Sequence, residues 1–175
     1  GNSAQLAAAG GANVVVFDKR QDRMAQMMAL GANVTTLYPY EEAVARELSD
    51  ADLVIGAVLV TGAKAPHVIS REMVAQMQPG SVIVDISVDQ GGCVETTRPT
   101  TYANPTYVEH GVIHFAVTNM PGAVPQTSSH AICAAILPFV QKLASGSWRD
   151  NQPLRRGINV EQGKLVHPAL QGMLG

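Results

Sequence analysis

Hydrophobic positions along the chain form short continuous runs, and small or amphipathic segments separate them. The runs predict five strands, over residues 12–18, 32–38, 52–59, 81–87 and 112–119. The segments between them predict helices over residues 2–9, 21–30, 41–48, 70–77 and 128–144. Ser70 has the side chain of a good N-cap for the fourth helix. Continuous apolar strands alternating with helices are typical of a parallel sheet covered on both faces, so we predict a doubly wound α/β fold of the Rossmann type.

The sequence begins with a predicted helix, Gly1 leading directly into it. No strand and no glycine fingerprint of the GxGxxG type stand before the first predicted strand, although a dinucleotide-binding fold uses both. We therefore expect a fragment that is truncated at its N-terminus. We predict a dinucleotide-binding domain over residues 1–125, without its first strand and glycine loop, and a C-terminal helix and tail over residues 126–175.

Four residues stand at or just past the C-terminal ends of predicted strands: Asp18, Leu59, Asp89 and Asn119. Right-handed crossovers bring the C-terminal ends of parallel strands to one edge of the sheet, where ligands bind in such folds. We therefore expect these four residues around one crevice. Asn119 is interpreted as a hydrogen-bond partner of a carboxamide or substrate, or as part of a plain crossover. The loop after the third strand carries Lys64 as a lone cation, either beside a flat ligand or in an ordinary connection.

Asp18 ends the run "VVVFD". In a dinucleotide-binding fold an acidic residue there accepts hydrogen bonds from the adenosine ribose and repels the 2′-phosphate of NADP. The alternative is an N-cap for the helix that starts near Gln21. The βαβ order favours the ribose interpretation and NAD. Lys19, Arg20 and Arg23 weaken that preference, since a basic cluster can accept a phosphate.

The stretch "SVIVDISVDQGGCVE" brings two carboxylates to the end of the fourth predicted strand. Asp85 lies inside the apolar run, where a charge is costly unless it has partners. Asp89 is interpreted as a turn former before the glycine pair, or as a carboxylate at the nicotinamide end of the crevice. Alternation places Asp85, Ser87 and Asp89 on one face if the strand stays extended that far.

Composition excludes several classes of function. Hydrophobic residues make up 46% of the 175 residues and the formal net charge is −2, which is typical of a globular protein and not of one with a basic nucleic-acid-binding stripe. The longest apolar runs fall far short of the ~20 residues that span a bilayer. Cys93, Cys133 and the five histidines show no metal-ligand spacing, and the two thiols fit a reducing, cytoplasmic compartment. We expect no metal site, no nucleic-acid partner and no membrane partner.

Three segments together resemble the alanine dehydrogenases: "DLVIGAVLVTGAKAPHVISREMV", "MQPGSVIVDISVDQGGCVETTRPTTYANPTY" and "NMPGAVPQTSSHA". The resemblance covers nearly all of residues 1–146. It implies a Rossmann NAD domain preceded by an N-terminal catalytic domain, onto which the last segment of the chain, here residues 126–175, folds back. It also implies that the substrate-binding arginine and lysine and the catalytic histidine lie in that preceding domain.

The resemblance also implies roles for individual residues. Asp89 matches the family's catalytic aspartate. The positions that match the NAD-binding ones are Asp18, Arg23, Val58, Leu59, Ile86, Ser87, Val88, Asp89, Arg98, Val117, Thr118, Asn119 and Met120. The family often has a serine where this chain has Pro39, which leaves that adenine-side contact without a counterpart.

The implied reaction is the reversible NAD-dependent oxidative deamination of L-alanine to pyruvate and ammonia, in L-alanine catabolism. L-alanine, pyruvate and ammonia are then the small-molecule partners, and the family implies a homo-oligomer, commonly a hexamer. Three alternatives stay open. One is the NAD-binding alpha subunit of a proton-translocating NAD(P) transhydrogenase, which usually has Glu-Asn-Gly-Gly where this chain has "DQGG". The others are a lysine-forming or opine-type dehydrogenase, and a fragment that binds nucleotide without catalysis.

Overall fold

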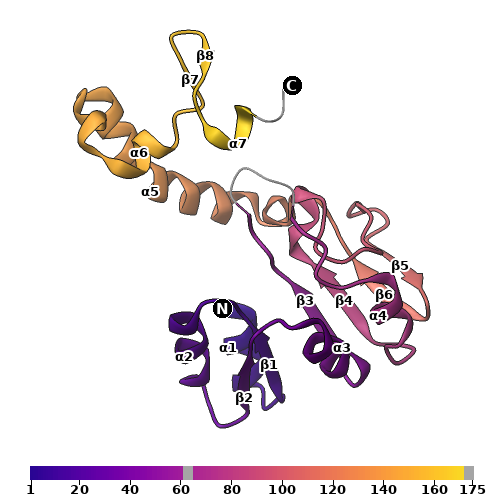
Figure 1. The fold of residues 1–175 in the computed structure, drawn as a ribbon. Helices are drawn as coiled ribbons and strands as arrows, with labels where there is room; N and C mark the ends of the chain where they lie inside the picture. The colour runs from indigo at the N-terminus through magenta and orange to yellow at the C-terminus, as the bar shows by residue number, and fades with distance from the viewer. Residues whose placement is uncertain (61–64, 172–175) are drawn as a thin grey trace. The chain divides into compact units, whose positions relative to one another are not determined.

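The computed structural model describes residues 1–60 and 65–171, which form two compact units. The first unit contains residues 1–59 and 65–118, and the second contains residue 60 and residues 119–171 (Figure 1). The first unit is a mixed α/β structure with parallel strand pairs, so the predicted fold class is confirmed. The boundary between the units falls between Thr118 and Asn119, one residue before the end of the last predicted strand.

The elements of the first unit alternate as the sequence pattern predicts. They are α1 (Asn2–Ala9), β1 (Val14–Phe17), α2 (Gln21–Met28), β2 (Val34–Leu37), α3 (Glu41–Ser49), β3 (Leu53–Gly56), α4 (Arg71–Ala75), β4 (Val82–Asp85), the 3₁₀ helix η1 (Ile86–Gln90), β5 (Thr106–Glu109) and β6 (Val112–Phe115). β1 and β2 form one parallel pair, and a second sheet has the strand order β3-β4-β6-β5, in which β5 alone is antiparallel. The predicted N-cap is confirmed, since the Ser70 hydroxyl accepts a hydrogen bond from the Met73 amide at 3.3 Å.

Two features of the second sheet differ from the prediction. β4 ends at Asp85 and the chain turns at once into η1, so the alternation expected through residue 89 was wrong. β5 was not predicted at all. It forms an edge hairpin with β6, and the turn residues His110 and Gly111 both have positive φ, at 52° and 77°. Two such residues in succession give the turn that matches the twist of paired strands.

The core of the first unit lies where α3 and α4 pack on the second sheet. Ile83 of β4 and Val112 of β6 are 1% and 0% exposed, and they join Val44 of α3 and Val74 of α4 in one apolar cluster. Complete burial of such side chains contributes about 1.5–3 kcal/mol each. This cluster fixes the central strands, and with them the strand ends that carry the candidate site.

The prediction that every strand is covered on both faces was wrong for the outer strands. Leu53 and Ile55 of β3 are 54% and 39% exposed, and Val15 of β1 is 38% exposed. Among the described residues β1 pairs only with β2, and β3 only with β4, so each has one unpaired edge. These apolar strands therefore bury less surface within the first unit than their sequences predict.

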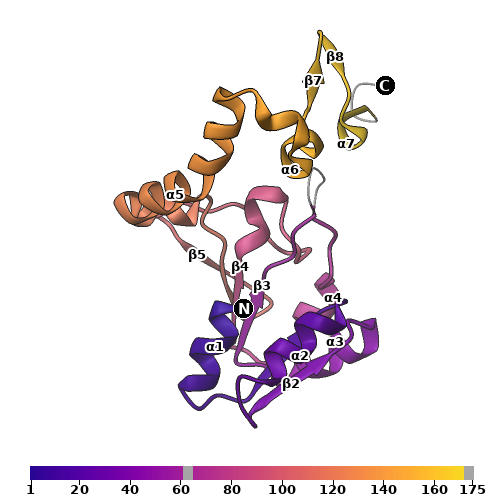
Figure 2. The ribbon, with the colours of Figure 1, turned by 90° about the vertical axis from the view of Figure 1, so that its left-hand side faces the viewer.

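The second unit is mostly helical. Its elements are η2 (Met120–Ala123), α5 (Pro125–Ala144), η3 (Ser147–Asp150), α6 (Gln152–Arg156), the hairpin of β7 (Val160–Glu161) and β8 (Lys164–Leu165), and α7 (Pro168–Gln171). α5 starts earlier than predicted because Pro125 is tolerated in the first helical turn, where its missing N–H has no partner to lose. Figure 2 shows α5 changing direction along its length. Pro138 inside the helix explains the bend, since it removes one backbone donor.

Candidate functional site

The candidate site is built on the neighbouring C-terminal ends of β3 and β4. Gly56, the last residue of β3, lies opposite Asp85, the last residue of β4, in parallel register. Beyond the strands the Ser87 hydroxyl donates a hydrogen bond to the Val58 carbonyl at 2.9 Å. The segment after β3 and the η1 turn after β4 are therefore joined, as expected for residues that share one sheet edge.

Exposure divides the predicted residues at this edge into two groups. Leu59 and Ile86 are 73% and 45% exposed, and Asp89 is also exposed. The Ser87 and Val88 side chains are buried, at 6% and 4% exposed. The first three side chains are thus open to a ligand, whereas the other two support the turn from within and present only backbone. The edge offers apolar surface and one carboxylate, a combination that suits a flat, partly apolar ligand.

Asp85 is the organising group of this turn. Its carboxylate is 1% exposed and accepts five hydrogen bonds. The donors are the Ser87 amide (2.9 Å) and Cys93 thiol (3.6 Å) on Oδ1, and the Cys93 amide (2.9 Å), Val94 amide (3.3 Å) and Thr97 hydroxyl (2.7 Å) on Oδ2. A carboxylate has only acceptor atoms, so this donor set fits it. Burial also raises the pKa of the Cys93 thiol, and the negative charge of Asp85 adds to the rise, so Cys93 stays a neutral donor.

Glycines around the turn are required by contacts within the chain. Gly91 ends η1 with a φ of 94°, and Gly92 follows with a φ of 79°. A Cβ at Gly92 would lie 2.9 Å from Asp85 Oδ2 and 2.8 Å from Thr97 Cγ2. A Cβ at Gly56 would lie 2.6 Å from Cys93 Sγ. The glycine pair thus allows the chain to close tightly around the buried carboxylate.

Asp18 lies just past β1 and is half-buried. Its Oδ1 accepts a hydrogen bond from the Arg20 amide at 2.8 Å, an Asx-type turn that precedes α2. Arg20 itself binds Asp22, with Nε 3.1 Å from Oδ1, and lowers the pKa of that carboxyl. The Arg23 guanidinium donates to the Gln26 side chain at 3.0 Å. Two members of the predicted basic cluster are therefore engaged by neighbours on the helix, which weakens the case for a phosphate there.

Arg98 is held by an aromatic platform. Its Cζ lies 3.8 Å from the centre of the Tyr107 ring, and its amide donates to the Tyr107 hydroxyl at 2.9 Å. The Tyr107 hydroxyl in turn donates to the Thr96 carbonyl at 2.7 Å. Burial raises the pKa of this phenol, so it remains a donor at neutral pH. The platform thus holds both the backbone amide and one face of the guanidinium of Arg98, although the residue as a whole is exposed.

His114 of β6 supports that platform from below. It is 1% exposed and its ring stacks on Tyr107 with the centroids 4.9 Å apart. Its Nδ1 lies 3.0 Å from the Val112 carbonyl, which can only accept, so Nδ1 carries the proton. Nε2 then accepts from the Thr96 hydroxyl at 2.7 Å. Burial lowers the pKa of His114, so the ring is neutral.

The four predicted residues after β6 differ in their surroundings. Val117 is 1% exposed and Thr118 is exposed, with its amide bonded to the Thr100 carbonyl at 3.3 Å. Asn119 begins the second unit in a left-handed conformation, at φ 50° and ψ 51°, as the N-cap of η2, and Met120 is half-buried. Lys64 lies outside the described residues.

Sequence reasoning missed the supporting residues, although it recorded a signal for them. An aspartate inside an apolar strand, as at Asp85, indicates partners that pattern alone does not name. His114, inside the apolar run of residues 112–117, offered the same kind of signal as Asp85, whereas Thr97 and Tyr107 lie in stretches with no apolar run to mark them as buried.

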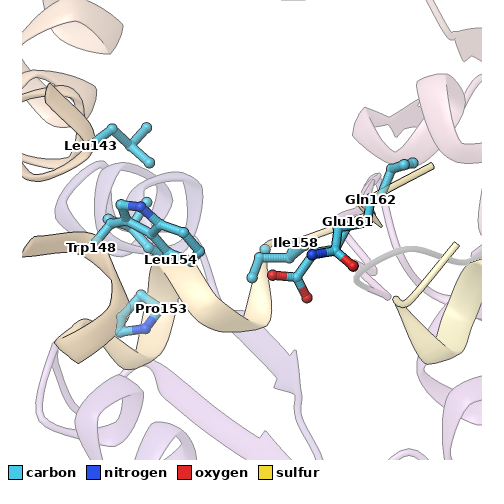
Figure 3. Close-up of a pocket in the computed structure, with 9 residues that line it drawn as sticks. Leu143, Trp148, Pro153, Leu154, Ile158, Glu161 and Gln162 are labelled. Carbon is cyan, nitrogen blue, oxygen red and sulfur yellow. The ribbon is translucent and has the colours of Figure 1, made fainter. Parts of the chain in front are cut away.

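A separate hollow lies in the second unit. It is lined by residues of α5, η3, α6, β7 and the segments beside β7, among them Leu143, Trp148, Leu154 and Ile158 (Figure 3). Trp148 lies beside Leu154 there, and the lining is mainly apolar. None of the predicted site residues lines it. Across residues 1–60 and 65–171 no three His, Cys, Asp or Glu side chains gather as metal ligands, and no helix in that part of the chain has the length and apolar character of a bilayer span.

Comparison with known proteins gives consistent matches. A family model described as "Alanine dehydrogenase/PNT, C-terminal domain" matches residues 1–168. The alanine dehydrogenase of Halomonas elongata is 44% identical over 179 residues, covering 99% of this chain and 48% of that protein. A solved L-alanine dehydrogenase is 44% identical with a TM-score of 0.82, covering 97% of this chain and 48% of that one. The transhydrogenase from Sinorhizobium meliloti is 26% identical with a TM-score of 0.75, covering 95% and 46%. The chain thus spans about half the length of the relatives it matches.

Proposed function

Because the chain belongs to the alanine dehydrogenase/PNT C-terminal domain family, we propose that it is the NAD-binding part of an alanine dehydrogenase. The reaction is the reversible oxidative deamination of L-alanine to pyruvate and ammonia. One observation carries the proposal from the structure: the exposed carboxylate of Asp89 stands on a rigid turn at the sheet edge where Leu59 and Ile86 offer apolar surface.

Family membership implies a nicotinamide nucleotide, and the first unit has surfaces that fit one. Asp18 Oδ1 accepts from the Arg20 amide, while Oδ2 makes no hydrogen bond to any described residue and is open to a ribose diol. We propose NAD rather than NADP, because a free carboxylate repels a 2′-phosphate and Arg20 is bound to Asp22. The other proposed contacts are Arg23, Val58, Arg98 and the residues from Val117 to Met120.

When bound, the nicotinamide supplies the hydride acceptor. The chain's own residues then hold the reactants and move protons. Asp89 is the proposed catalytic residue: its carboxylate accepts hydrogen bonds from the substrate amine and from the water that replaces it, and thereby orients both. Leu59 and Ile86 exclude bulk water from the ligand side of the edge, which strengthens these polar contacts.

We also propose the wider assignments that the family suggests. The exposed apolar surfaces of β1, β3 and α5 fit packing against further segments of a longer protein, including a catalytic domain that binds the C-terminal helix and tail. A homohexamer in the cytoplasm completes the proposal. We also propose that the nucleotide-binding domain ends at residue 125 and that the C-terminal helix and tail begin at residue 126.

The proposal is tested with the full gene product. We expect alanine-dependent NADH formation at alkaline pH by the full protein and none by the 175-residue chain alone. Asp89→Asn in the full protein should lower kcat by about 100-fold or more while NAD still binds, because an amide cannot take up a proton. Calorimetric titration with NAD provides the binding control. Near wild-type turnover of this variant would remove Asp89 from catalysis.

One observation favours a second candidate. The transhydrogenase structure shares the fold over 95% of this chain, at 26% identity. A full protein inactive with alanine, which exchanges hydride between NADH and an NADP analogue when a membrane subunit is added, would support this candidate instead. The higher identity to alanine dehydrogenases, 44% over 99% of the chain, places it second.

A further inference from the structure

We propose that Asp85 is a positioning residue for the reaction: it never touches substrate, but its buried carboxylate fixes the place of Asp89. This inference rests on the proposed function, since it takes Asp89 as the catalytic residue. It assigns a purpose to a charged side chain that is 1% exposed at the end of a central apolar strand.

The first argument is where the donors come from. The Ser87 amide lies in η1, two residues before Asp89. The Cys93 and Val94 amides and the Thr97 hydroxyl lie on the chain that returns from the turn. One carboxylate thus fastens both arms of the loop whose tip carries Asp89. The turn also has backbone bonds of its own, from the Gly91 amide to the Val88 carbonyl and from the Gly92 amide to the Ser87 carbonyl, and the Asp85 carboxylate ties this turn to the end of β4.

The second argument is what holds Asp85. It is the last residue of β4, which pairs with β3 on one side and β6 on the other. The strand is central and its neighbour Ile83 is 1% exposed. Asp85 therefore has a fixed backbone, and its hydrogen bonds tie the loop that carries Asp89 to this central strand. Catalytic groups must be held within about 0.5 Å of the productive geometry, and neighbours of this kind hold them.

The third argument is that no close substitute fits. Asparagine replaces one oxygen by an NH₂ donor, which would face the Ser87 amide and Cys93 thiol on one side or three donors on the other. Glutamate is longer by one methylene, which would displace its oxygens from donors that Asp85 meets at 2.7 Å and 2.9 Å. The site is thus specific for an aspartate.

The test removes one bond to Asp85 in the full gene product. Thr97→Val deletes the 2.7 Å hydroxyl donor and keeps the shape of the side chain. We expect kcat for alanine oxidation to fall about 10- to 100-fold, as displacements of a catalytic group by a fraction of an ångström do, with the KM for NAD changed less than about twofold. Thr97→Ser restores the donor and should recover most of kcat. Asp85→Asn should have a larger effect, and Thr97→Val serves if that variant does not fold.

Two controls separate positioning from general damage. Ser81→Ala deletes a buried hydroxyl that also donates at 2.7 Å, to the Gln78 carbonyl at the other end of β4, and should leave kcat unchanged. In an Asp89→Asn background Thr97→Val should cause little further loss in single-turnover rate, since the group it positions is already removed. An equal loss in both backgrounds, or wild-type kcat in Thr97→Val, overturns the inference. A wild-type protein that does not oxidise alanine overturns the proposed function, and this inference with it.

Discussion

Two strands of the first unit have an aspartate at or just past their C-terminal end, and the two carboxylates have opposite surroundings. Asp85, at the end of β4, is 1% exposed, and both of its oxygens are occupied by donors from the chain. Asp18, just past β1, is half-buried and receives one backbone hydrogen bond on one oxygen. A carboxylate whose acceptor positions are filled stabilises the chain around it, whereas one with an open oxygen can bind a ligand. Asp85 and Asp18 therefore have similar positions near strand ends, and the degree of burial decides whether each carboxylate stabilises the chain or can bind a ligand.

The largest expected difference between the two sites is in stability. Asp85→Asn leaves buried N–H donors facing another donor and should lower the free energy of unfolding by about 3 kcal/mol. Asp18→Asn retains an oxygen that can accept from the Arg20 amide, so its cost should stay within about 0.5 kcal/mol. Denaturant unfolding of the full gene product measures both. Equal costs for the two variants would contradict the distinction drawn from burial.

The next effect is on cofactor affinity, and there the order of the two sites is reversed. Asp18→Asn should raise the Kd for NAD about 10-fold, because charge-assisted hydrogen bonds to the ribose are replaced by neutral ones. It should also narrow the preference for NAD over NADP, since the repulsion of the 2′-phosphate is lost. Fluorescence titration with both nucleotides measures this. Glu47→Gln changes another half-buried carboxylate of the first unit, one that accepts from Arg46, and as the control it should leave both affinities unchanged.

The contrast also shows what the sequence could and could not predict. The apolar runs correctly predicted β1, β2, β3, β4 and β6, because a strand that is to be buried consists largely of apolar residues. The end of β4 at Asp85 was missed, because the turn depends on donors up to Thr97 that become partners only in the folded chain. The β5 strand was missed because "TYVE" is not an apolar run and His110-Gly111 is not one of the Asn-Gly or Asp-Gly pairs that mark a two-residue hairpin turn. The exposure of Leu53 was missed because a hydrophobic pattern shows which residues prefer burial, and does not show whether another segment packs against them.

The positions of Asp18 and Asp89 were predicted from the sequence, whereas the contacts that support Asp89 were not. Both were placed at a sheet edge by counting from the ends of apolar runs, which needs no knowledge of contacts. The donors that Asp85 receives from Cys93 and Thr97, and the contact of Arg98 with Tyr107, join residues 8 to 12 positions apart and could not be read from a local pattern.

The smallest expected effect is a pH dependence of folding stability that comes from His114 of β6, the strand beside β4. Burial lowers the pKa of His114 from its ordinary 6.5; nearby Arg98 and His110 lower it further, while Glu109 and the Val112 carbonyl oppose the change. The unfolded chain therefore takes up a proton below about pH 6.5 and the folded chain does not, so stability from His114 is full above that pH and is lost as the pH falls.

This loss can be measured as the thermal midpoint of the full gene product between pH 7.5 and pH 5.5. His114→Gln should lower the thermal midpoint at pH 7.5, because the hydrogen bond to Thr96 is disturbed. A Gln is neutral at every pH, so the further fall of the midpoint between pH 7.5 and pH 5.5 should be about 2–4 °C smaller in this variant than in the wild type. Because the Asx-type turn at Asp18 contains no histidine, NAD affinity per folded molecule should change little over the same range. A parallel fall in both proteins would mean that His114 takes up its proton without unfolding, and that the Thr96 hydroxyl can reorient to accept from it.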